Sequence, residues 1–218
     1  MTRLLALVLI LVPTLALAGP GTDAVKKANE TISDLLKKKA PAAQVTTSVN
    51  NFIDIDELGK RAMGDHWGKL KPDQQSKFLD KLHQLIEANY TQGMQANLNY
   101  TVAYTGESTD PKGNVMVTTK ITTQRKGRPV DIEVDYVLAK EGAGYRAFDV
   151  QTDGVGLVEN YGQQFDKILE RDGFDGLVKK MDKKIADLGA KGAAASGTNT
   201  GSTAGGSTGT TSTGAGAK

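Results

Sequence analysis

The spacing of the apolar residues changes twice along the chain. They recur every three to four positions over residues 22–90, every second position over residues 98–150, and every three to four positions again over residues 154–188. The first period is that of an amphipathic helix, and the second is that of a strand with one apolar face. The chain is therefore predicted to be an α+β protein in which helices precede and follow a single sheet.

Cap and break residues divide the first helical region into several helices. They are predicted at residues 22–39, 45–52, 54–64 and 72–90. Thr22 is suited to cap the first helix, and Asp54 or Asp56 to cap the third. Gly64 is suited to end the third helix, and Pro72 to occupy the first turn of the fourth.

The alternating region is predicted to form four strands. Short turns join them, at residues 110–114, 125–128 and 141–144. Short connections favour antiparallel neighbours, so we expect a four-stranded meander with one apolar face that the helices cover. Asp153-Gly154 then turns the chain from the last strand into two closing helices, at about residues 154–170 and 174–188.

Neither end of the chain has the pattern of a folded domain. Residues 1–18 contain Arg3, an apolar run and Ala16-Leu17-Ala18, which together predict a cleaved signal peptide. Residues 189–218 are nearly all Gly, Ala, Ser and Thr, and we expect a disordered tail. One exported domain is therefore expected at residues 19–188, located in the periplasm if the source has an outer membrane.

Charge and composition argue against several functions. The 27 Lys and Arg residues nearly balance the 25 Asp and Glu residues and are scattered, so neither nucleic acid nor an electrostatic membrane anchor is expected. The sequence has no Cys, which excludes disulfides, a lipid-modified Cys and a Cys nucleophile. Its two His residues do not have a zinc-binding spacing, so no metal site is expected.

Candidate catalytic groups are few. Asp65 precedes His66 and could orient it as a base, but no nucleophile is placed beside the pair. Three carboxylates in residues 131–135 share the polar face of a strand and could act as a base or hold a hard cation. Pairing with Lys120 on the neighbouring strand explains them more simply. We therefore expect neither a catalytic site nor a cofactor.

Several segments resemble the characteristic blocks of the MlaC-type family, also called the toluene-tolerance or Ttg family. Residues 53–90, with Gly64-Asp65-His66-Trp67 at their centre, are similar to its first block. Residues 145–165, with the turn Asp153-Gly154-Val155, are similar to its second block, and residues 173–178 to the start of its final helix. The blocks follow the family's order and spacing.

The resemblance implies a periplasmic lipid carrier that is not an enzyme. Family members have a helix-wrapped sheet, similar to the nuclear-transport-factor and cystatin folds, with a hollow apolar core. They carry phospholipid between an outer-membrane lipoprotein complex and the MCE-domain protein of an inner-membrane ABC transporter, which maintains outer-membrane lipid asymmetry. A sister branch is associated with hopanoids. We therefore expect a monomeric carrier with a phospholipid, or alternatively a hopanoid, as cargo.

The chain departs from the family pattern at two positions in the second block. Gly156 stands where the family often has Ser, and Gly162 where an Arg commonly follows Asn-Tyr. Because glycine has no side chain, these two positions weaken the inference from the family of a polar role for residues 145–165. The headgroup is expected to stay near solvent, since no cluster of arginines converges to bind it.

The acyl chains are expected to lie between the inner face of the sheet and the helices. The expected lining residues are Phe78, Leu82, Leu85, Tyr90, Tyr100, Val102, Tyr104, Val117, Ile132, Val134, Tyr136, Phe148, Val150, Val155, Leu157, Tyr161 and Phe165. Periodicity does not decide whether such a core is hollow or filled. Two alternatives therefore stay open: an exported interaction module with a solid core, and an enzyme of similar fold that uses Asp65, His66 or a strand carboxylate as base.

Overall fold

The computed structural model describes the backbone of residues 19–94, 100–125 and 127–197, and the side chains of residues 19–89, 100–124 and 127–190. The helices and strands follow the predicted order. They are α1 (Pro20–Lys37), α2 (Ala42–Phe52), α3 (Ile55–Met63), the 3₁₀ helix η1 (Gly64–Lys69), α4 (Pro72–Met94), β1 (Tyr100–Thr109), β2 (Val115–Arg125), β3 (Arg128–Glu141), β4 (Gly144–Thr152), β5 (Val155–Gly156) and α5 (Leu157–Gly197). The α+β class is therefore confirmed.

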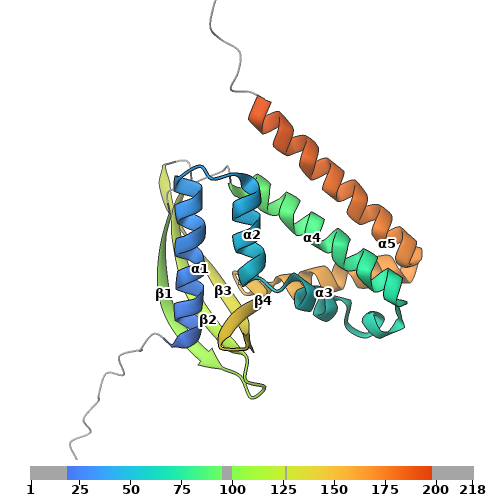
Figure 1. Ribbon diagram of the computed structural model, residues 1–218, viewed down its shortest axis with the longest axis horizontal. Coiled ribbons are helices and arrows are strands. Elements are labelled where there is room, and N and C mark those ends of the chain that lie inside the picture. Colours follow the sequence, from blue (N-terminus) through green and yellow to red (C-terminus); the bar gives the residue numbers. More distant parts are fainter. Residues whose placement is uncertain (1–18, 95–99, 126, 198–218) are drawn as a thin grey trace, which may run out of the picture.

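The helices form two groups around the sheet. Figure 1 shows α1 and α2 side by side over one face of the sheet, with α3 continuing from α2. The second half of α5, orange to red in Figure 1, runs alongside α4, and α3 packs against both. The inner face of the sheet is thus bounded by α1 and α2 on one side and by the α3–α4–α5 group on the other.

Within the described residues the sheet has five antiparallel strands in the order β1-β2-β3-β4-β5, one more than predicted. The additional strand, β5, has two residues and pairs with the end of β4. Asp153 and Gly154 both have positive φ, 50° and 81°, so they form the tight hairpin turn that Asp-Gly favours. The predicted turn from the last long strand into a helix is therefore a hairpin followed by a helix. A two-residue strand is too short to show a period, which is why four strands were expected.

Two β-bulges change which side chains face inward. A register shift after Tyr104 lets Glu107 face Val117 on β2, although simple alternation from Tyr104 would place Glu107 on the outer face. A second shift leaves Phe148 as the additional residue of β4, so Ala147 pairs with Leu138. The regular alternation that the sequence predicts over residues 145–150 is therefore interrupted at Phe148.

The first bulge places a carboxylate at the start of α1. Thr22 donates hydrogen bonds from its backbone N and its Oγ1 to Glu107 Oε2, each 2.7 Å long. A carboxylate at a helix N-terminus satisfies free N–H groups and interacts favourably with the helix dipole. Thr22 was predicted to cap this helix, but α1 begins at Pro20 and the cap comes from a strand.

The other helix boundaries show where cap signals are sufficient. Asp54 caps α3 by accepting a 3.0 Å hydrogen bond from the backbone N of Glu57, and Pro72 begins α4, as predicted. The two predicted closing helices are the two parts of α5, which is kinked at Gly173 (φ 67°). Residues 189–197 of the predicted tail are helical, since Ala is the strongest helix former and this stretch is rich in it.

Candidate functional site: an apolar cavity

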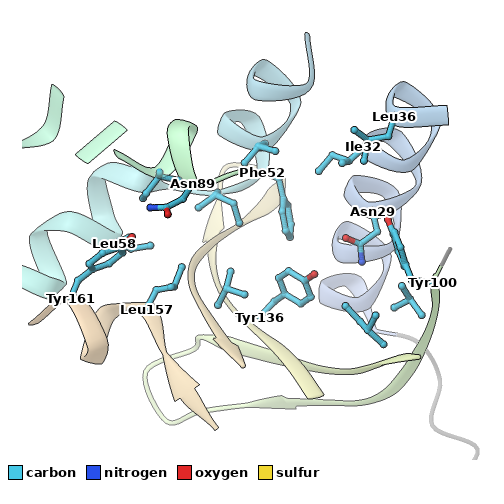
Figure 2. A pocket seen from close by; sticks show the side chains of 16 residues that line it. Asn29, Ile32, Leu36, Phe52, Leu58, Asn89, Tyr100, Tyr136, Leu157 and Tyr161 are labelled. Carbon is cyan, nitrogen blue, oxygen red and sulfur yellow. The ribbon is translucent and has the colours of Figure 1, made fainter. Parts of the chain in front are cut away.

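A cavity of about 660 Å³ lies between the inner face of the sheet and the helices. Figure 2 shows it as an elongated space, with Leu58, Asn89, Leu157 and Tyr161 at one end and Asn29, Leu36 and Tyr100 at the other. Its lining comes from all five α-helices and four strands. The lining residues are Asn29, Ile32, Leu36, Val49, Phe52, Ile53, Leu58, Ile86, Asn89, Tyr100, Val102, Ile121, Tyr136, Val150, Leu157 and Tyr161.

The position of α1 explains why this space is open. At its N-terminal end α1 is so close to the sheet that a Cβ on Gly21 would lie 2.6 Å from Val115 Cγ1. Val25 is also fully buried there, in a cluster with Val117 and Leu138. Further along the helix, Ile32 and Leu36 line the cavity instead. The first half of the helix is therefore packed against the strands, and the second half borders the cavity.

Six of the predicted lining residues line this cavity. They are Tyr100, Val102, Tyr136, Val150, Leu157 and Tyr161. Ile132 and Val134 are half-buried on β3, but they do not line it. Val117 is fully buried beneath α1, and Tyr104 packs against that same cluster.

Four predicted lining residues lie in a separate core cluster and not in the cavity wall, although Leu85 and Phe165 also border an adjoining hollow of about 430 Å³. Phe78, Leu82, Leu85 and Phe165 are buried in the cluster between α3, α4 and α5. The rings of Phe78 and Phe165 meet edge to face with centroids 5.4 Å apart. Tyr161 stacks on Phe165 with a centroid distance of 5.5 Å, so it forms the boundary between this core cluster and the cavity.

Three predicted lining residues have other positions. Phe148 is buried, with the Arg61 guanidinium 3.8 Å from the centre of its ring. Val155 was predicted to point inward, but it is 54% exposed, because the hairpin places it on the short strand β5. Tyr90 lies in α4, and its side chain is outside the described part of the structure.

Helices α1, α2 and α3 also contribute to the cavity wall, which the sequence did not predict. Their lining residues are Asn29, Ile32, Leu36, Val49, Phe52, Ile53 and Leu58. Ile32 and Leu36 are four positions apart on the apolar side of the first helix, and that spacing was the available signal. The choice between core and cavity depends on how far each helix is from the sheet, which spacing does not give.

The cavity wall is neutral. Its described lining has no Asp, Glu, Lys, Arg or His. Burial raises the pKa of Tyr136 to about 12, and burial also raises the pKa of Tyr161, so both phenols are uncharged at neutral pH. Asn29 Nδ2 donates a 3.3 Å hydrogen bond to the Tyr104 hydroxyl, so the side-chain amide of Asn29 in the wall has a partner within the protein. Such a wall accommodates an apolar ligand without burying an unpaired charge.

A buried carboxylate fixes the corner at which α5 begins. Asp149 is 7% exposed, and its Oδ1 accepts a 3.0 Å hydrogen bond from the backbone N of Val158 in the first turn of α5. A Cβ on Gly156 would lie 2.5 Å from Asp149 Oδ2. A side chain at position 156 would therefore displace the carboxylate that positions Leu157 and Tyr161 in the wall.

The candidate catalytic groups lie elsewhere. His66 Nε2 is 2.8 Å from Asp166 Oδ1, His83 Nε2 is 2.8 Å from Asp56 Oδ1, and neither histidine lines the cavity. Lys120 Nζ is 2.7 Å from Asp131 Oδ2, which confirms the predicted cross-strand pair. Within the described part of the chain no group of three metal-ligating side chains is close enough to hold a metal ion. The described helices also include none with the length and apolar character of a membrane span.

Fold and cavity together define a protein class, an α+β domain with an internal apolar cavity of ligand size. Residues 22–183 match the family model described as MlaC protein, and the chain belongs to this family. It is 20% identical over 136 residues to the intermembrane phospholipid transport system binding protein MlaC of Haemophilus influenzae, a match that covers 62% of this chain and 64% of that protein, less than two thirds of its length.

A solved structure has a similar fold. It is a phospholipid-binding protein from Ralstonia solanacearum in complex with a phospholipid, 25% identical to this chain, with a TM-score of 0.67. The similarity covers 78% of this chain and 99% of the Ralstonia protein. Almost the whole of that phospholipid-binding protein is therefore similar in fold to most of this chain.

Proposed function

We propose that this protein is a carrier that binds the acyl chains of a phospholipid in the cavity between the sheet and the helices. The observation that carries the proposal is the neutral cavity of about 660 Å³, in a chain similar to a protein solved with a phospholipid. A carrier needs a wall nearly as apolar as the bilayer, because each methylene resists entering water by about 0.8 kcal/mol. The six predicted residues in the wall, and the helix residues around them, are the proposed acyl-binding residues.

The volume of the cavity limits what it holds by itself. A methylene occupies about as much space as a water molecule in the liquid, ~30 Å³, so the cavity has room for roughly 20 of them. A typical diacyl phospholipid has roughly thirty. Two adjoining hollows of about 490 and 430 Å³ share lining residues with the two ends of the cavity. Parts of the lipid therefore extend into at least one of these hollows, or the cavity widens on binding.

We further propose that the carrier works in the periplasm after removal of residues 1–18. On this proposal it moves phospholipid between an outer-membrane lipoprotein complex and the MCE-domain protein of an inner-membrane ABC transporter, and so maintains outer-membrane lipid asymmetry. Moving such a lipid through water without a carrier would cost roughly 20 kcal/mol or more. No cofactor and no catalytic step are needed for this role.

Native mass spectrometry of the protein purified from bacteria tests the acyl-binding proposal. The expected result is a bound mass equal to that of a diacyl phospholipid. Val150→Trp and Leu157→Trp fill the cavity and should lower the bound fraction several-fold while the domain stays folded. Val155→Trp is the matched control, since it adds the same side chain at a position that is 54% exposed. Equal lipid content in all three variants and in the wild type would contradict the proposed site.

A further inference from the structure

The two hollows that adjoin the cavity differ in charge. The hollow of about 490 Å³ lies between α1 and β1 and adjoins the cavity at Asn29, Tyr100 and Val102. Its charged lining has two lysines, Lys26 and Lys37, and two carboxylates, Glu30 and Asp34. The opposite charges balance, so this end of the cavity offers no net attraction to an anion.

The hollow of about 430 Å³ lies between α4 and the two parts of α5, at the other end of the cavity. It adjoins the cavity at Asn89, Leu157 and Tyr161. Its charged lining consists of Lys180 and Lys184, and its described lining has no carboxylate. The lining of this hollow is therefore positively charged, and one positive charge remains after the pairing of Lys180 with Asp172 is taken into account.

The two lysines have donors available for a ligand. They are one helical turn apart on α5, on the side that also carries Leu177 and Met181. Lys180 is half-buried and pairs with Asp172 through a 2.7 Å contact, which leaves further N–H groups of its ammonium free. Lys184 is exposed, and among the described residues it has no ion-pair partner.

The same hollow is also amphipathic. Leu85, Phe165 and Ile168 give it an apolar wall that continues from the cavity, while Asn160 and Gln164 bring side-chain amides. Gln164 Nε2 donates to Asn160 Oδ1 over 2.6 Å, so these amides lie together. A ligand leaving the cavity past Tyr161 would therefore find apolar groups, amides and two ammonium groups in one hollow. These three kinds of group suit the acyl chain, the glycerol ester and the phosphate of a phospholipid.

We propose that Lys180 and Lys184 form the phosphate-binding subsite of the carrier, and that the headgroup lies at the α4–α5 end of the cavity. This inference rests on the proposed function. The sequence led to the expectation that no cluster of arginines converges on the headgroup. The proposal adds that two lysines can bind a phosphate as point charges. The polar group at the other end, Asn29 with Tyr104, is already hydrogen-bonded within the protein and does not require a ligand.

The test compares two ligands with the same tails. Delipidated protein is offered equal amounts of dioleoyl phosphatidylglycerol and dioleoylglycerol, which lacks the phosphate, and the ratio of the two bound masses is measured by native mass spectrometry. Lys180→Gln/Lys184→Gln should lower that ratio about fivefold, because two partly exposed charge contacts are lost. Lys184→Gln alone should lower it about twofold, and its exposed position makes unfolding no alternative explanation. Raising the salt concentration should lower the wild-type ratio as well.

Matched variants separate this subsite from general charge effects. Lys183→Gln removes the same charge one residue away, outside the lining of this hollow, and should leave the ratio unchanged. Lys26→Gln/Lys37→Gln tests the opposite end. The proposal is overturned if the Lys180/Lys184 variant keeps the wild-type ratio, or if the Lys26/Lys37 variant loses it instead. Wild-type protein that binds dioleoylglycerol and phosphatidylglycerol equally overturns the subsite alone, whereas protein that binds neither overturns the carrier function too.

Discussion

The interior of this protein has two regions with similar residues and different packing. Between α3, α4 and α5 the apolar side chains pack closely around Phe78, Leu82 and Leu177, which are fully buried, and the hollow of about 430 Å³ lies open at the edge of this cluster. Between the sheet and α1 and α2, side chains such as Ile32, Leu36 and Val150 surround a cavity of about 660 Å³. The filled region gives the domain its stability, because dispersion contacts need atoms on both sides. Side chains around the cavity lack such contacts on the side that faces the open space, and they can form them with a ligand.

The largest expected effect comes from emptying the filled region. Phe78 is fully buried, and its ring meets Trp67 and Phe165 edge to face. Phe78→Ala should lower the free energy of unfolding by about 3–5 kcal/mol, through lost transfer energy and a new cavity. Urea denaturation followed by circular dichroism measures this. A loss below about 1 kcal/mol would mean that the α3–α4–α5 cluster is not the stabilising core.

The hollow region has its own signature at high pH. The pKa of Tyr136 is raised to about 12 from 10.0, chiefly by burial. The folded state therefore holds the phenolic proton more tightly than the unfolded state. The contribution of Tyr136 to stability is therefore fully present below pH 10 and is lost as the pH rises from about 10 to 12. The expected loss from this residue is roughly 2–3 kcal/mol. Urea denaturation at several pH values measures it.

Tyr136→Phe is the control for the alkaline effect. It removes the ionisable group and keeps the ring that packs against Phe52 at a centroid distance of 5.9 Å. The variant should lose less stability than the wild type between pH 10 and 12. Equal losses of stability at alkaline pH in the two proteins would show that Tyr136 is solvated. The part of the cavity beside Tyr136 would then not be a dry, apolar space.

A smaller effect is expected at the corner that joins the two regions. Gly156→Ala would place its Cβ 2.5 Å from Asp149 Oδ2 and disturb the cap of α5. The expected loss is about 1–2 kcal/mol, together with weaker lipid binding because Leu157 and Tyr161 follow in the same helix turn. Gly68→Ala is the matched control, since a Cβ there would meet nothing within 4 Å. If both variants unfold at the same urea concentration, the hydrogen bond between Asp149 and Val158 does not depend on a glycine at position 156.

The contrast between Val117 and Val150 shows how far the sequence can predict this interior. Both valines occupy inward positions of alternating strands, and both were predicted to line the cavity. Val117 is fully buried beneath α1, whereas Val150 lines the cavity. Alternation identifies the inner face of a strand, but not the distance from that face to the covering helix. That distance depends on contacts between remote segments, such as the contact of Gly21 with Val115.

Local signals predicted the elements whose cause is local. Asp54 at the start of α3 and Pro72 at the start of α4 both have their expected roles. The two bulges and β5 each involve only one or two residues, and no period can reveal a feature of that length. Glu107 shows the consequence. It caps α1 from a strand far along the chain, and it does so only because a bulge turns it inward.

The smallest effect on the lipid-free protein is expected from Ile32→Ala, and it gives the sharpest test of the comparison. Ile32 is half-buried and borders the cavity, so its truncation enlarges an existing space and should cost only about 1 kcal/mol. When lipid fills the cavity, the same side chain gains contacts on its open side. Bound lipid should therefore raise the melting temperature of Ile32→Ala less than that of the wild type. The same increase in both proteins would mean that the acyl chains do not reach α1, and would confine the ligand to the half of the cavity near Tyr161.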